Sequence, residues 1–228
     1  RRSSDLDDAF ASYKNRNKAA LKNQELNPNV AFSDSIQAGI YMKHPRIIRI
    51  KADMVDQMDY DKILSMYQDR FKDASDFTFI FVGNVDVEKM KPVIAEYLGA
   101  LPAVNRKETF KDNKIEMRQG IYKNEFTKQQ ETPKASVFAF YNGDCKYDLR
   151  NNLLLSMTSQ ILDLVYTEKV REDEGGTYGV YVGGTLQKYP KEKAILQIIF
   201  DTAPEKKEKL MKIIFGEIDN IMKTGPSE

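Results

Sequence analysis

The chain has 228 residues, of which 41% are hydrophobic and 30% are charged. This composition supports a substantial core in one large or two small globular units. The 35 basic and 34 acidic residues are interspersed and give a net charge of +1, so nucleic acid and anionic membranes are not expected as partners. No stretch approaches eighteen apolar residues, so no membrane span is predicted.

The N-terminal part is predicted to be helical. Residues 5–26 form a polar helix that the following NPN ends, and a second helix is predicted in SDSIQAGIYMK, residues 33–43. Asp53 and Asp59 are predicted to cap two further helices. The core stripe predicted for the last of these is Ile63, Leu64, Tyr67 and Phe71. Residues 1–73 are therefore predicted to be a helical N-terminal segment.

The pattern changes after this segment. FTFIFVGN, residues 77–84, is a continuous β-branched and aromatic run before a glycine, which predicts a buried strand. DVEKMKPVIAEYLGALP then predicts a helix, whose regular part is expected to begin near Met90 because Pro92 removes a backbone hydrogen bond. Its predicted inward residues are Val87, Met90, Val93, Ile94 and Tyr97. The polar residues 103–114 are predicted to link two lobes, with a lobe boundary near 102–114.

The second half predicts strands and long helices in alternation. Strands are expected in EMRQGIYKNEFT, KASVFAFYNG, TYGVYVGGTLQKY and KAILQIIFDTA, the last two joined by a YPKEK turn. A long helix is predicted over 149–171, and a last one opens with Pro204. The inward face predicted for the long helix is Leu154, Met157, Ile161, Leu164 and Val165. Residues 74–228 are therefore expected to be an α+β domain with a mixed or antiparallel sheet packed against long helices.

Several kinds of catalytic site are excluded by the residue counts. His44 is the only histidine, whereas zinc motifs of the H-x-x-E-H type need two imidazoles. A lone histidine beside a proline favours a structural or surface role. Cys145 is the only cysteine, so neither an internal disulfide nor a cysteine-based metal cluster is possible. The acids at 172–174 are interpreted as a solvated helix end, although carboxylates can also act as bases or cation ligands.

The segment KVREDEGGTYGVYVGG, residues 169–184, carries the main candidate site. Arg171 lies where the long helix is predicted to end, so the negative end of the helix dipole favours its guanidinium. Gly175 and Gly176 permit a reversal of the chain before Tyr178. A guanidinium and a phenol are good hydrogen-bond donors for a peptide carbonyl or for an oxyanion. The alternative is that Arg171 pairs with a local acid and Tyr178 fills a gap beside the glycines.

Two blocks of the sequence resemble the M16 family of zinc metallopeptidases, the insulinase or pitrilysin-like enzymes. LVYTEKVREDEGGTYGVYVGG resembles the helix, turn and strand of the family's C-terminal, non-zinc-binding domain. RFKDASDFTFIFVGNVDVEKMKPVIAEYLGALP resembles the family's helix, strand and helix that precede it. NPNVAFSD and KHPR upstream resemble the bacterial single-chain branch. The resemblance implies the LuxS/MPP-like metallohydrolase fold.

The resemblance also implies roles for single residues. Arg171 and Tyr178 match the arginine and tyrosine that reach across a closed chamber to hold the substrate backbone. Gly175, Gly176, Thr177 and Gly179 match the substrate-binding turn around them. The zinc ligands and general base have no counterpart, so zinc is expected in another half, on the same chain or on a partner. This chain alone is expected to be inactive and to contain no metal site.

The resemblance further implies a peptide substrate and favours the periplasm or cell envelope. Both ends of the chain are typical of positions inside a longer protein, so a fragment of such a protein is expected. Two other interpretations stay open from the sequence. One is a catalytically inactive structural subunit of the same family, and the other is an unrelated α+β binding module.

Overall fold

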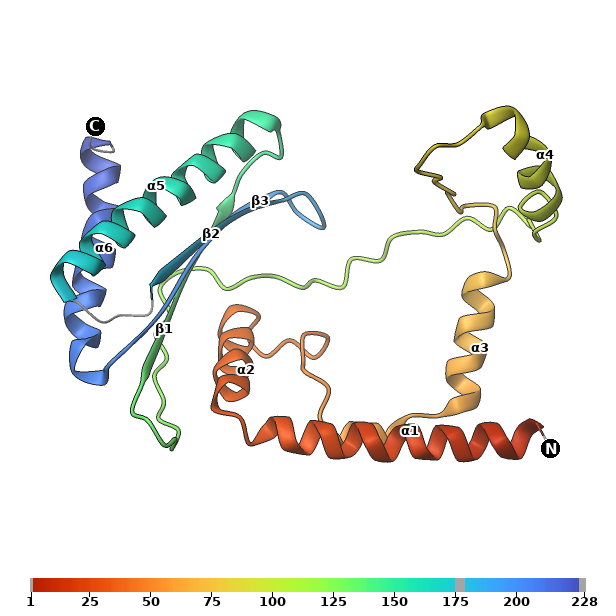
Figure 1. The fold of residues 1–228 in the computed structure, drawn as a ribbon, viewed down its shortest axis with the longest axis horizontal. Coiled ribbons are helices and arrows are strands. Elements are labelled where there is room, and N and C mark those ends of the chain that lie inside the picture. The colour runs from red at the N-terminus through yellow and green to blue at the C-terminus, as the bar shows by residue number, and fades with distance from the viewer. Residues whose placement is uncertain (1, 175–178, 226–228) are drawn as a thin grey trace. The chain divides into compact units, whose positions relative to one another are not determined.

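The structure is a computed structural model that describes residues 2–174 and 179–225, without the side chains of 2–5 and 170–174. The helices are α1 (Arg2–Glu25), α2 (Pro28–Ile40), α3 (Tyr60–Phe71), α4 (Val87–Tyr97), α5 (Leu149–Glu174) and α6 (Lys207–Thr224), as labelled in Figure 1. Two short 3-10 helices are η1 (Ala52–Gln57) and η2 (Pro204–Lys206). The strands are β1 (Ala135–Asp144), β2 (Val180–Gln187) and β3 (Lys193–Thr202).

The chain divides into two compact units, and neither is continuous in sequence. The first unit consists of Arg1–Asn27 and Arg49–Asn113, and the second of Pro28–Ile48 and Lys114–Glu228. The division predicted from the sequence, into a helical segment 1–73 and an α+β domain 74–228, stays a prediction. Among the described residues, no helix is long and apolar enough to cross a membrane.

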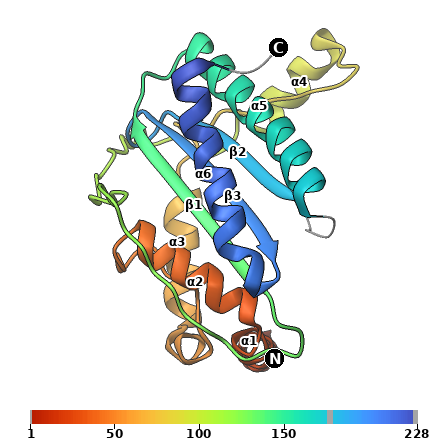
Figure 2. The same ribbon diagram turned by 90° about the vertical axis from the view of Figure 1, so that its left-hand side faces the viewer.

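The second unit contains an antiparallel sheet with strand order β1-β3-β2. Val137 of β1 and Val180 of β2 are both paired with Phe200 of the central strand. Helices α5 and α6 cover one face of this sheet, as Figures 1 and 2 show. Apolar side chains from both layers form a buried cluster of Leu162, Tyr166, Val180, Val182, Ile198, Phe200, Leu210 and Ile214. The α+β class with an antiparallel sheet against long helices is confirmed.

Helix α2 also belongs to the second unit and is held by residues more than seventy positions away. Arg118 donates its backbone N–H to the carbonyl of Ile40 at 2.7 Å and its Nε to the carbonyl of Gly39 at 2.8 Å. The Arg118 guanidinium lies over the Tyr122 ring, 4.1 Å from the centroid. These contacts satisfy carbonyls at the end of α2, which an isolated helix would leave to water.

The face of α5 that meets the sheet is not the predicted one. Leu162 and Tyr166 are buried, Ser159 is 8% exposed and Leu155 is half-buried. Of the predicted inward residues, Leu154, Met157 and Leu164 are exposed, whereas Ile161 and Val165 are half-buried. The prediction was right for Val165, which packs against the buried cluster, and wrong for Leu154, Met157 and Leu164. Helix α5 has apolar residues around most of its circumference, so helical periodicity could not select one face.

In the first unit, α1, α3 and α4 correspond to predicted helices, but the apolar faces predicted for α3 and α4 are largely exposed. Asp59 caps α3 by accepting the Lys62 N–H at 2.9 Å, as predicted. Asp53 caps no helix: it lies inside η1, whose N-cap is Lys51. The predicted core residues Ile63, Leu64, Tyr67 and Phe71 are all exposed.

Helix α4 begins earlier than predicted. It starts at Val87 rather than near Met90, because Asp86 accepts the Lys89 N–H at 3.2 Å and caps the first turn. Pro92 lies inside the helix. The predicted inward residues Val87, Val93 and Tyr97 are exposed, whereas Met90 and Ile94 are half-buried.

Two predicted strands are absent from the described part of the chain. Residues 77–84 and 116–127 have the composition of strands, but neither pairs with a neighbour there. A strand needs a partner for its backbone groups, and sequence composition does not supply one. Both segments are therefore irregular in this structure.

Candidate functional site

The candidate site is the connection between α5 and β2. Arg171 lies in the last turn of α5, which continues three residues beyond the predicted end, to Glu174. The Arg171 side chain lies outside what the structure describes, and so do Gly175, Gly176, Thr177 and Tyr178. Gly179 is described and immediately precedes β2. The structure therefore shows the two elements that hold the connection, the C-terminal part of α5 and the start of β2, which we call its two supports. It does not show the predicted clamp, which is the pair of side chains of Arg171 and Tyr178.

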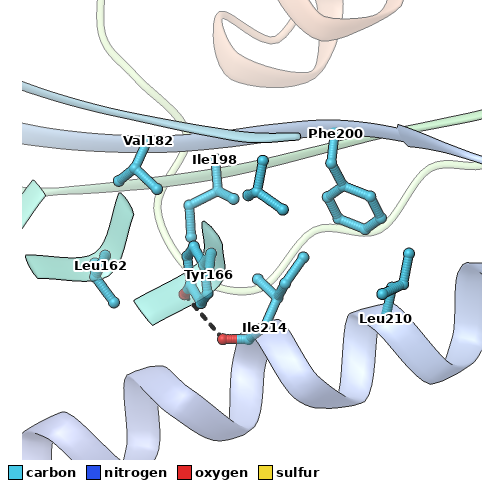
Figure 3. Close-up of a cluster of buried hydrophobic side chains, with 8 residues drawn as sticks. Leu162, Tyr166, Val182, Ile198, Phe200, Leu210 and Ile214 are labelled. Carbon is cyan, nitrogen blue, oxygen red and sulfur yellow. Dashed lines mark hydrogen bonds between the residues drawn. The ribbon is translucent and has the colours of Figure 1, made fainter. Parts of the chain in front are cut away.

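The helical support is fixed by contacts to α6. Tyr166 is fully buried, and its hydroxyl donates to the carbonyl oxygen of Ile214 at 2.9 Å, as Figure 3 shows. Closer to the helix end, Lys169 Nζ lies 2.7 Å from Glu217 Oε1. A buried hydrogen bond and an ion pair thus join the last turns of α5 to the neighbouring helix.

The strand support begins directly after a left-handed residue. Gly179 has a φ of +50°, a conformation that glycine adopts without the steric cost of a Cβ. Val180 then pairs with Phe200 and joins the buried cluster. Since Tyr166 belongs to the same cluster, one core fixes both ends of the connection.

A close approach between α5 and β2 reinforces this arrangement. A Cβ at Gly184 would lie 2.3 Å from Ser159 Oγ and 2.9 Å from Leu155 Cγ, both on α5. Ser159 Oγ itself donates to the carbonyl of Leu155 at 2.9 Å. Glycine at this position therefore lets the strand lie against the helix, which holds the two supports at a short separation.

Strand β2 occupies an edge of the sheet in the described structure, because only β3 pairs with it. Tyr181 points away from the buried side of the strand and is 57% exposed. An edge strand offers backbone donors and acceptors to another extended segment. The outer edge of β2 can therefore form hydrogen bonds with the backbone of an extended segment.

Two phenols of the second unit, the buried Tyr166 and the partly exposed Tyr141, serve as structural groups rather than as acids. Burial raises the pKa of Tyr166 far above its usual value, and the nearby Tyr141 and Glu217 raise it further. The pKa of Tyr141 is also raised, first by burial and then by Asp219. Both hydroxyls therefore stay protonated at neutral pH, which suits the hydrogen bond from Tyr166 to Ile214.

The described residues do not fit a zinc site. No group of three His, Cys, Asp or Glu side chains in that part of the chain could hold a metal ion. His44 instead accepts a hydrogen bond at Nδ1 from the Arg46 N–H at 3.2 Å, which agrees with the structural role favoured from its sequence context.

The sequence analysis missed a buried carboxylate in the first unit. Asp73 is 4% exposed and accepts hydrogen bonds from the N–H groups of Ser75, Val104 and Arg106 at 3.0, 3.0 and 2.7 Å. The Ser75 hydroxyl also donates to it. The bond from Ser75, followed by those from the backbone, lowers the pKa of Asp73 far below its usual range. The sequence signal was Asp-Ala-Ser directly after a helix, which is typical of an Asx turn.

A small polar cavity lies beside this carboxylate. It has a volume of about 80 Å³ and is lined by Arg70, Asp73, Asp76, Phe77, Arg106 and Glu108. Its two arginines are already ion-paired, Arg70 with Glu108 and Arg106 with both Asp69 and Glu108. These ion pairs connect the end of α3 to residues 106–108. Each arginine of the cavity is thus already neutralised by a carboxylate, so the cavity does not favour an anionic ligand.

Residues 57–228 match the family description "Peptidase M16 inactive domain". The chain belongs to the M16 peptidase family. "Probable zinc protease PqqL" of Escherichia coli (strain K12) is 24% identical over 210 residues, which cover 91% of this chain and 22% of that protein. The chain thus spans about a quarter of the length of the curated relatives it matches.

Solved structures show the same fold. The crystal structure of the periplasmic protease PqqL from Escherichia coli matches with a TM-score of 0.80 and 21% identity, covering 97% of this chain and 24% of that one. The M16 inactive domain from Pseudomonas fluorescens matches with a TM-score of 0.66 and 20% identity, covering 96% of this chain and 53% of that one. The M16 fold inferred from the sequence is therefore confirmed.

Proposed function

We propose that this M16 chain is the substrate-binding, catalytically incomplete half of a zinc peptidase that cleaves peptides. In this proposal, Arg171 and Tyr178 form a clamp on the substrate backbone, and Gly175, Gly176, Thr177 and Gly179 form the turn that admits the substrate. The zinc ion belongs to another half, on the same polypeptide or on a partner. The activity and substrates of the complete protein are part of the proposal.

The observation that carries this proposal is the fixed pair of supports around the connection. The C-terminal half of α5 is joined to α6 by the Tyr166 hydrogen bond, and β2 starts from the same core at Val180. A short connection between two fixed points restricts where its side chains can lie. Donors held in position before substrate binds lose less freedom when they engage it.

The chemistry follows from the two donors. A guanidinium and a phenol both donate hydrogen bonds and neither needs to lose a proton, so they suit a carbonyl oxygen that gains negative charge during attack. A zinc ion bound in the other half would supply Lewis-acid chemistry at the same carbonyl. The free edge of β2 lies next to the connection and could align an extended peptide through backbone hydrogen bonds.

The test is a pair of substitutions in the complete enzyme. Arg171→Ala and Tyr178→Phe should each lower kcat/KM by ~10²-fold or more, the scale of a lost oxyanion donor. Zinc content and circular dichroism should stay unchanged. The matched controls are Arg150→Ala, at the other end of α5, and Tyr189→Phe, after β2, because both side chains are exposed. The controls should leave kcat/KM within twofold or so.

Unchanged cleavage by both Arg171 and Tyr178 variants would instead support a catalytically inactive structural subunit. We place the complete protein in the periplasm or cell envelope, because the E. coli relative is described as a periplasmic protease. Fractionation of the native host with an antibody to this chain tests that location.

A further inference from the structure

Lys169 of α5 and Glu217 of α6 form an ion pair at positions where an apolar contact is expected. Lys169 lies three positions after Tyr166, which is fully buried, and Glu217 lies three positions after Ile214, which is also fully buried. Residues three apart lie on the same face of a helix. Each charged residue therefore continues a stripe of buried residues, and the two stripes meet in a pair of opposite charges.

The pair is close, and its carboxylate is mostly shielded from water. Lys169 Nζ lies 2.7 Å from Glu217 Oε1, and the Glu217 side chain is 14% exposed, whereas that of Lys169 is 47% exposed. Asn220 Nδ2 also donates to Glu217 Oε1, at 3.4 Å. A carboxylate with little access to water needs such donors, because an unpaired buried charge is strongly unfavourable. The pair therefore holds its geometry more firmly than an ion pair at the surface does.

The pair extends the contact between the two helices towards the end of α5. The Tyr166 hydroxyl, bonded to the Ile214 carbonyl (Figure 3), holds the helix five residues before Arg171. The ion pair adds a second contact three residues further on, only two residues before Arg171. The backbone of a helix turns by a fixed angle at each residue. The rotation of α5 that is set at Lys169 therefore also sets the backbone direction at Arg171.

A small rotation at this level has a large consequence for a hydrogen-bond donor. An atom at the outer radius of a helix lies ~6 Å from the axis, so a rotation of ~10° moves it by ~1 Å. A misplacement of ~1 Å can lower a rate by ~10²-fold when the atom must meet a reacting group. An ion pair is more directional than an apolar contact, and buried ionic groups can select a single conformation.

We propose that Lys169 and Glu217 are positioning residues, which hold the last turn of α5 so that the Arg171 guanidinium meets the substrate carbonyl. This inference rests on the proposed function, because it requires Arg171 to bind the substrate. In this arrangement the pair contacts neither the substrate nor the zinc ion and acts only through Arg171. Its effect on cleavage should therefore disappear once the Arg171 side chain is removed.

The test is a double-mutant cycle in the complete enzyme. Glu217→Gln removes the charge and keeps the shape, so it should lower kcat/KM by ~10-fold or more. In the Arg171→Ala background, the same substitution should lower kcat/KM by less than ~2-fold. Asp144→Asn is the matched control, because this carboxylate pairs with Lys193 Nζ at 2.7 Å, at the other end of β2 from the connection. The control should change kcat/KM by less than ~2-fold in both backgrounds.

Two further measurements separate positioning from a general loss of stability. Lys169→Glu places two carboxylates together and should also lower kcat/KM by ~10-fold or more, and adding Glu217→Lys should recover ~5-fold or more of that loss. Hydrogen exchange with mass spectrometry supplies a readout besides activity. Amides of residues 170–174 should exchange ~3-fold or more faster in Glu217→Gln, whereas those of β1 should exchange at unchanged rates.

An equal loss of kcat/KM on Glu217→Gln with and without Arg171 would overturn the proposal in favour of a general effect on stability. Normal cleavage by Glu217→Gln beside impaired cleavage by Arg171→Ala would overturn the positioning role and leave the proposed function intact. Normal cleavage by Arg171→Ala itself would overturn both. If Glu217→Gln fails to fold, Lys169→Gln, at the more exposed partner, gives the same cycle with the same expected outcomes.

Discussion

Replacing Gly184 by alanine tests whether β2 and α5 are held at the short separation that the structure shows. The added Cβ would lie 2.3 Å from Ser159 Oγ and 2.9 Å from Leu155 Cγ, well inside ordinary van der Waals contact. Either the Ser159 hydroxyl rotates and loses its hydrogen bond to the Leu155 carbonyl, or α5 moves away from the sheet. Such overpacking costs ~1–3 kcal/mol, and each kcal/mol lowers Tm by ~2–4 °C in a protein of this size.

The assay is urea denaturation followed by far-UV circular dichroism, with Gly143→Ala as the matched control. Gly143 lies on β1 of the same sheet, and a Cβ there meets no atom within 4 Å, so this control should change stability by less than ~0.5 kcal/mol. Adding Ser159→Ala to Gly184→Ala should recover part of the loss, with a coupling energy of ~0.5–3 kcal/mol. Equal effects of the two glycine substitutions would refute the close approach.

Three further predictions concern buried groups. Tyr166→Phe should cost ~0.5–1.5 kcal/mol by removing the hydroxyl bond to Ile214. Because the pKa of Tyr166 is raised above the ordinary 10.0, its contribution is complete below pH 10 and is lost as pH rises, so the variant should lose less stability in alkaline denaturation. The pKa of Asp73 is lowered from 3.8, so the contribution of this carboxylate to stability is present above that pH and is lost as the pH falls below it. Asp73→Asn should weaken amide protection at Val104 in hydrogen exchange, and the stability of this variant should fall less on acidification than that of the unsubstituted protein. Leu210→Ala, at a fully buried position, should cost ~2–5 kcal/mol in urea denaturation, and an effect under ~0.5 kcal/mol would contradict the core described for the second unit.

Local sequence signals predicted the elements whose partners are close in the chain. Strands β2 and β3 have strand-like composition and are joined by the short YPKEK turn, so both their existence and their pairing could be predicted. The cap at Asp59 was likewise visible, because capping depends on a few neighbouring residues. In both cases the deciding interactions lie within about twenty residues.

The features that the sequence could not predict depend on distant partners. Tyr166 bonds to a carbonyl 48 positions away, and Asp73 binds amides about thirty positions away. Residues 77–84 have the composition of a strand but find no pairing partner in the described structure. The predicted clamp was identified from a family pattern rather than from local physics, and its roles at Arg171 and Tyr178 stay a proposal.

The discontinuity of the second unit has a consequence for biosynthesis. Gly39, near the end of α2, accepts its hydrogen bond from Arg118, which is 79 residues further along the chain. At a translation rate of about 5–20 residues per second, ~4–16 s pass between the synthesis of Gly39 and that of Arg118. During that interval, a more advanced nascent chain on the same mRNA can supply its own Arg118. The expected misassembled product is a swapped dimer in which α2 of one copy holds Arg118 of the other, and its yield should rise when translation slows between residues 49 and 113.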